Sequence, residues 1–246
     1  MLHRCSTLGL LGGVCWLLFG LLSSLAAQET EKSEPAAFGD PPNAKRLVPE
    51  YDVWIDRQRN LVILDGEVCL REGQLEMFAC PRGTKEHESI VACNTKAFVV
   101  HAALLSVGAE VGHPVQFTPK YVPAAGSEVE IYLLWFDSAG KRRTARAQEW
   151  IRNAETDEEM TYNWVFAGSG FWTDEASGKR HYQAEAGDFI CVSNFSSAML
   201  DLPVESTQAN QGLLFAAYTE RIPPIGTKVR LVLAPKVDQR DPQPRE

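Results

Sequence analysis

Six consecutive residues, Thr84 to Ser89, form the densest group of ionisable side chains in this sequence. They are followed directly by the apolar run Ile90-Val91-Ala92. If the segment enters a strand, alternate side chains point to opposite faces. One face then carries Lys85, His87 and Ser89, and the other carries Glu86 and Glu88.

Each face suggests its own chemistry. His87 could act as a base or a metal ligand while Lys85 holds an anion. Glu86 and Glu88 could bind a divalent cation, because such ions prefer carboxylate oxygens. The alternative is a charged loop that leads into a strand, and composition alone does not separate these interpretations.

A second histidine, His101, lies three residues after Phe98 in a predicted helix, on the face expected to meet the sheet. A buried imidazole must find a partner or stay neutral at a desolvation cost. A core histidine with a satisfied hydrogen bond is one interpretation. In the other, His101 joins His87 and either Glu76 or Glu86 in a three-ligand metal site with an open position.

Four cysteines follow the first 27 residues: Cys69, Cys80, Cys93 and Cys191. Cys80 and Cys93 flank the polar loop and could close it with a disulfide, although four cysteines allow three pairings. Cys191 lies in an apolar run and is expected to be a small buried side chain. None of the four lies two residues from another, so zinc ribbons and iron–sulfur clusters are not expected.

The N-terminus predicts export. His3 and Arg4 are followed by an apolar stretch over residues 8–22 and a small-residue exit that ends at Ala27. This pattern is typical of a cleaved signal peptide over residues 1–27. We therefore expect an extracytoplasmic protein, periplasmic or secreted. It would contact the membrane only if the segment stays uncleaved as an anchor.

Composition divides the remainder into three parts. Residues 28–45 predict a flexible tether, residues 46–235 a single β-rich domain, and residues 236–246 a disordered tail. Similar turn residues at 123–126 and 223–226 each precede a strand and hint at two related halves. The net charge of −8 provides no concentrated basic face, so no nucleic acid partner is expected.

Short apolar runs between turn residues predict about ten strands, and one helix is predicted over about 95–107, with Asn94 or Thr95 as its cap. The predicted fold class is α+β, mostly β. Antiparallel strands would form sandwich-like layers with that one main helix packed on them.

Several of these segments resemble the YdjY-domain family, in particular its larger secreted members. The resemblance is carried by Gly66 to Cys69, Leu75 to Cys80, Thr84 to Ser89, His101 to Leu105, Trp164 to Ser169 and Ile190 to Phe195. It implies no activity, because this is a family of unknown function. Some members carry a ferredoxin-like label. The scattered cysteines and the lack of a twin-arginine signal argue against a cluster in this chain.

The sequence therefore predicts an exported, non-catalytic domain that binds a small ligand or an envelope protein. The candidate binding residues are Glu76, Lys85, Glu86, His87, Glu88, Ser89 and His101. No cofactor is expected. The alternatives are a metal-assisted hydrolase, with His87 and His101 as ligands and Glu86 or Glu88 as the base, and a purely structural surface protein. The metal site requires the two imidazoles to converge.

Overall fold

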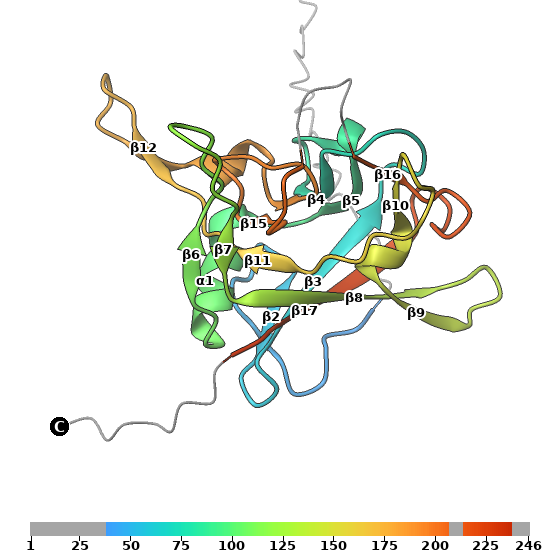
Figure 1. Cartoon of the computed structure of the whole chain (residues 1–246). Helices are drawn as coiled ribbons and strands as arrows, with labels where there is room; N and C mark the ends of the chain where they lie inside the picture. The colour runs from blue at the N-terminus through green and yellow to red at the C-terminus, as the bar shows by residue number, and fades with distance from the viewer. Residues whose placement is uncertain (1–37, 207–213, 238–246) are drawn as a thin grey trace, which may run out of the picture. The chain divides into compact units, whose positions relative to one another are not determined.

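A computed structural model of the chain describes residues 38–206 and 214–237, and most of the elements in them are β-strands. Eleven strands form one large sheet (Figure 1). They are β1 (Lys45–Arg46), β2 (Val53–Asp56), β3 (Leu61–Val68), β4 (Met77–Pro81), β5 (Ser89–Cys93), β8 (Glu128–Phe136), β9 (Arg142–Arg146), β11 (Trp164–Phe166), β14 (Ile190–Cys191), β15 (Leu200–Asp201) and β17 (Lys228–Pro235).

The described residues also contain three two-stranded sheets and four helices. The small sheets pair β6 (Val111–His113) with β7 (Ala125–Gly126), β10 (Ile151–Asn153) with β16 (Phe215–Ala217), and β12 (Phe171–Thr173) with β13 (Arg180–Tyr182). The helices are α1 (Ala97–Ser106) and the 3-10 helices η1 (Glu86–Glu88), η2 (Ala147–Trp150) and η3 (Gln183–Ala186). The predicted helix is confirmed as α1.

The large sheet closes on itself, so the predicted sandwich-like layers are wrong. Strands follow the order β3, β17, β8, β11, β15, β14, β4 and β5, and β5 pairs back onto β3. These eight strands form a barrel. Two of the pairs, β4 with β5 and β14 with β15, are parallel, so the sheet is mixed.

Closure depends on β3, because two strands share one of its edges. The first half of β3 pairs with β2, and Gly66 to Val68 pair with β5. The other edge of β3 pairs with β17 over most of its length. Apolar alternation in a sequence shows which segments form strands but not which edges meet. The spacing of the runs therefore predicts strands without predicting closure.

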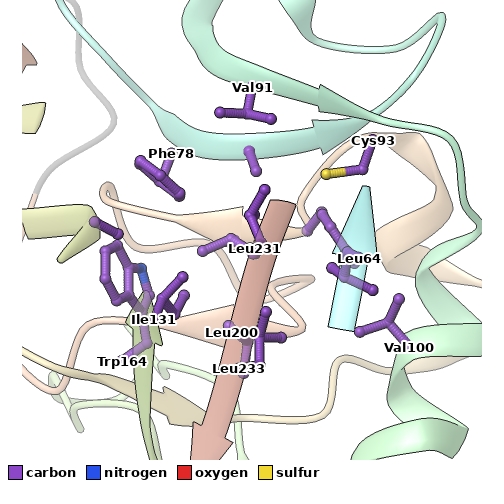
Figure 2. Close-up of a cluster of buried hydrophobic side chains, with 14 of the residues drawn as sticks. Leu64, Phe78, Val91, Cys93, Val100, Ile131, Trp164, Leu200, Leu231 and Leu233 are labelled. Carbon is purple, nitrogen blue, oxygen red and sulfur yellow. The ribbon is translucent and has the colours of Figure 1, made fainter. Parts of the chain in front are cut away.

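The barrel interior is filled by apolar side chains from strands and helix (Figure 2). Leu231 and Leu233 on β17 and Leu64 on β3 are no more than 1% exposed, and Val100 of α1 lies in the same cluster. Trp164 buries its ring there and satisfies its indole N–H on the carbonyl oxygen of Cys191 at 2.7 Å. One α-helix and one barrel thus share a single core.

The ends of the chain only partly follow the predicted boundaries. Phe38 is already buried, with its ring against Phe136 and under the Arg230 guanidinium. The folded part therefore begins before residue 46, inside the predicted tether. The predicted signal peptide and most of the predicted tail lie outside the described residues. Among the residues that are described, no helix is long and apolar enough to cross a membrane.

Gly66 allows the closure of the barrel. A Cβ at this position would lie 2.8 Å from the carbonyl oxygen of Ala92 and 2.8 Å from Cγ1 of Val91, both on β5. Such contacts are shorter than van der Waals separation, so any side chain here pushes β5 away from β3.

We expect Gly66→Ala to lower the free energy of unfolding by about 1–3 kcal/mol, the usual cost of overpacking. The control is Gly39→Ala, because a Cβ at Gly39 has no neighbour within 4 Å. Urea unfolding of both variants measures the difference. An unchanged midpoint for Gly66→Ala would show that β5 does not approach β3 this closely.

Candidate functional site

One seven-residue segment, Tyr182 to Asp188, links the two groups of polar residues that the sequence singled out. Its first residue contacts His101, and its last contacts Lys85. Between them, η3 presents Glu185 to the start of α1, where Oε1 accepts a hydrogen bond of 2.8 Å from the backbone N–H of Phe98. This segment therefore connects the Lys85 cluster, helix α1 and His101.

The ammonium group of Lys85 lies among three carboxylates and one aromatic ring. Its Nζ is 3.1 Å from Oδ1 of Asp188, 3.3 Å from Oε1 of Glu88 and 3.4 Å from Oε2 of Glu76. It also lies 4.4 Å from the ring centroid of Phe195. We call these four charged side chains the Lys85 cluster: Lys85, Glu76, Glu88 and Asp188. They are mostly buried, and none is more than 23% exposed.

The turn of η1 creates this arrangement. In a 3-10 helix, side chains three residues apart lie on the same side, which brings Lys85 and Glu88 together. The segment is therefore a charged turn that leads into β5, which agrees with the loop interpretation, and the alternate faces of a strand do not apply to it. Glu86 accepts the backbone N–H of Gly83, and the hydroxyl of Ser89 donates to the carbonyl oxygen of Lys85.

Electrostatic interactions in this cluster favour the charged form of Lys85. Burial opposes the lysine charge, but attraction by Asp188 and the two glutamates outweighs it and raises the pKa of Lys85. Burial, together with repulsion from Glu88, raises the pKa of Glu76 in spite of the nearby ammonium. Because Lys85 already has three anionic partners, its charge neutralises the protein's own carboxylates instead of an external anion.

His101 forms a separate site. The Tyr182 hydroxyl donates its hydrogen to the carbonyl oxygen of Gly168 at 3.0 Å. Nδ1 of His101, 2.9 Å from the same hydroxyl oxygen, must then be the donor in that contact. Nε2 consequently carries no hydrogen and presents a lone pair. Burial lowers the pKa of His101, so the imidazole is neutral at pH 7.

The structure does not bring the two predicted metal ligands together. His87 is 78% exposed and approaches only Glu88, at 3.8 Å, whereas His101 bonds to Tyr182. Within residues 38–206 and 214–237, no group of three or more His, Cys, Asp or Glu side chains is arranged to hold a metal ion. The interpretation of His101 as a satisfied histidine agrees with its Tyr182 partner.

The predicted Cys80–Cys93 disulfide is not formed, and all four described cysteines are free thiols. Cys80 pairs with Ala92 in the parallel register of β4 and β5, while Cys93 pairs with Pro81. Adjacent residues on a strand point to opposite faces, so the two sulfur atoms lie on opposite faces of the sheet. Burial raises the pKa of every one of these thiols, to about 12 for Cys69. The thiols therefore stay protonated.

A group of exposed apolar side chains surrounds His101, and we call it the His101 face. It consists of Phe98, Leu105, Val111 and Phe171, each between 46% and 51% exposed. The Phe171 ring lies 5.1 Å from that of Tyr182, the hydrogen-bond partner of His101. A Cβ at Gly168 would meet both Val111 and the imidazole, so those two side chains converge on this glycine.

A fully buried carboxylate lies close to the Lys85 cluster. Asp201 on β15 is 0% exposed, and its Oδ1 accepts hydrogen bonds from Asn194 Nδ2 and from the backbone N–H of Leu202. Its Oδ2 has no hydrogen-bond partner among the described residues. Burial raises the pKa of Asp201 to about 7, even though these hydrogen bonds oppose the shift.

Sequence reasoning missed four residues of this region: Tyr182, Glu185, Asp188 and Phe195. Each reaches its partner across the fold; Glu185, for example, caps a helix 87 positions away. The predicted cap, Asn94 or Thr95, is wrong, because α1 begins after Lys96, which makes no side-chain cap hydrogen bond. A helix start without its own cap indicates that another segment must supply an acceptor.

Comparison with known proteins identifies the family. The sequence model of the YdjY domain family matches residues 53–234, and the chain therefore belongs to this family. No curated protein matches the chain, and no solved structure does.

We expect Lys85→Met to lower the free energy of unfolding at pH 7 by about 3 kcal/mol, because it leaves three mostly buried carboxylates without their cation. The loss should shrink when the pH is lowered from 7 to 5, because the raised pKa of Glu76 lets this carboxylate take up a proton. The exposed Lys141→Met is the control. Chemical unfolding at both pH values tests this, and wild-type stability of Lys85→Met at pH 7 would contradict it.

The raised pKa of Asp201 predicts how the stability of the protein changes with pH. Its folded pKa of about 7 exceeds the ordinary value of 3.8, so the folded state holds more protons between these two pH values. Stability should therefore fall as pH rises from about 4 to about 7.

Asp201→Asn keeps the accepting oxygen and cannot ionise, so it should flatten this fall, whereas the exposed Asp157→Asn should leave it unchanged. Urea unfolding across this pH range measures both slopes. Equal slopes for wild type and Asp201→Asn would show that Asp201 ionises normally.

Proposed function

We propose that this YdjY-domain protein is a non-catalytic binding domain that works outside the cytoplasm and binds an envelope protein through the His101 face. The observation that carries the proposal is the composition of α1. Its ten residues, Ala-Phe-Val-Val-His-Ala-Ala-Leu-Leu-Ser, include no Asp, Glu, Lys or Arg, yet only one side of the helix packs on the core.

A helix that is apolar all round is normally buried all round. In α1, Val99, Val100 and Leu104 are buried, while Phe98 and Leu105 face solvent. Exposed apolar patches with a polar rim are typical of interaction sites. Arg180 supplies part of such a rim, because its guanidinium lies 4.1 Å from the ring centroid of Phe171.

Several elements extend the surface, which favours a protein partner over a small molecule. Phe98 and Leu105 come from α1, Val111 from β6 and Phe171 from β12. Figure 1 shows these three elements along one side of the fold. His101 belongs to this surface, and its Nε2 is proposed as a hydrogen-bond acceptor for an N–H or O–H group of the partner.

The Lys85 cluster supports this proposal by position. Asp188, Glu185 and Tyr182 belong to one segment. The ion pair of Asp188 with Lys85 therefore helps to hold Tyr182, the hydrogen-bond partner of His101. Lys85, Glu76 and Glu88 are therefore proposed as residues that shape the binding face without contacting the partner. Metal-assisted hydrolysis is not favoured, because His87 and His101 have separate partners.

Site-specific photo-crosslinking in cells that naturally make the protein tests this function. p-Benzoylphenylalanine is placed at Phe98 or Phe171 and, as a control, at Tyr162, an aromatic residue of similar exposure. We expect the first two positions to yield an adduct of the same mass in the extracytoplasmic fraction, and Tyr162 to yield none.

Adding Leu105→Glu should abolish the adduct at Phe171, because a carboxylate in the apolar face opposes burial. Adducts that form equally at Tyr162, or none at either face position in folded, exported protein, would overturn the proposal.

A further inference from the structure

A second feature, distant in the sequence from the His101 face, is a cavity of about 630 Å³ at one end of the barrel. Its walls are the end of β8 with the start of the β8–β9 hairpin, and the loop that precedes β17, both at the right of Figure 1. The volume falls within the range of small-molecule sites, which often occupy the mouths of β-barrels.

The inward-facing side chains of β8 continue from the barrel interior to this cavity. Ile131 and Leu133 on β8 point inward and are about 1% exposed, and Trp135 continues the same alternation. Trp135 is half-buried, lines the cavity and holds its ring 5.2 Å from that of Trp150. Pro223 and Pro224 form part of the opposite wall, so rigid apolar surfaces lie on two sides of the space.

Three cationic side chains lie at the same mouth, and Lys228 among them is paired with Glu67. Arg143, Arg221 and Lys228 line the cavity, against two carboxylates, Asp137 and Glu220. Arg143 donates from Nε to Asp137 at 2.8 Å, and its two terminal nitrogens make no hydrogen bond to a described residue. Those donors form the planar pair that suits a carboxylate, sulfonate or phosphate group.

Arg221 is fixed over the ring of Tyr218 at 4.0 Å and pairs with Glu159. Its side chain and that of Arg143 are 39% and 49% exposed, so each existing ion pair contributes little and can be shared with a ligand. The cavity thus combines flat apolar walls with two available guanidinium groups.

From this geometry we infer that the barrel mouth is a binding site for a small aromatic anion. The ring system of the ligand lies between Trp135 and the Pro223–Pro224 wall, and its anionic group accepts hydrogen bonds from Arg143 and Arg221. This site is independent of the His101 face, and a protein partner on that face does not require it.

Two fluorescent probes that share one ring system and differ by an anionic sulfonate group test the inference. 1-Anilinonaphthalene-8-sulfonate carries the anionic group, and N-phenyl-1-naphthylamine is the same ring system without it. The purified domain from residue 28 should bind the sulfonate, and Arg143→Gln and Arg221→Gln should each weaken that binding roughly tenfold, the usual effect of losing a hydrogen bond to a charged group. Binding of the neutral probe should change less than twofold.

Phe98→Ser on the His101 face is the matched control and should leave sulfonate binding unchanged. Melting temperatures of the arginine variants, expected to equal that of the wild type, verify that probe binding reports the site and not unfolding. Wild-type sulfonate affinity in both arginine variants, or loss of binding in Phe98→Ser alone, would overturn the inference. Neither result bears on crosslinking at Phe98 and Phe171, so the two proposals fail separately.

Discussion

The ammonium group of Lys85 joins two nearby glutamates to Asp188, which is about a hundred residues further along the chain. Glu76 precedes β4, Glu88 ends η1 and Asp188 follows η3, and each places a carboxylate within 3.4 Å of the same nitrogen. Without that cation, three mostly buried negative charges would repel one another. Asp188 ends the segment that also carries Tyr182, the partner of His101, and Glu185, the cap of α1, so this interaction ties that segment to η1.

The barrel supplies the rigid frame for the cluster. Closure between β3 and β5 fixes β4 beside β5, and η1 joins these two parallel strands. Because β14 pairs with β4, Asp188 just before β14 is brought to the same side as Lys85. A packing constraint at Gly66 and an electrostatic one at Lys85 therefore act on neighbouring strands. The first determines where the strands lie and the second determines how the loops between them are held.

The sequence predicts the local features of this molecule better than its long-range ones. Apolar periodicity identifies α1 and most strands, and charge density identifies Lys85, Glu86 and Glu88, because both are properties of neighbouring residues. Barrel closure and the Asp188 contact join residues far apart in the chain, which no local pattern encodes. The convergence of His87 with His101 failed for the same reason: the turn of η1 directs His87 to solvent, whereas α1 directs His101 to Tyr182.

Hydrogen–deuterium exchange on Lys85→Met tests most directly whether the cluster holds the Tyr182 to Asp188 segment. We predict faster exchange in residues 76–88, in residues 182–188 and in the first turn of α1, while β8 and β17 stay as protected as in the wild type. Unchanged exchange in residues 182–188, or equal acceleration across every strand of the barrel, would contradict the account.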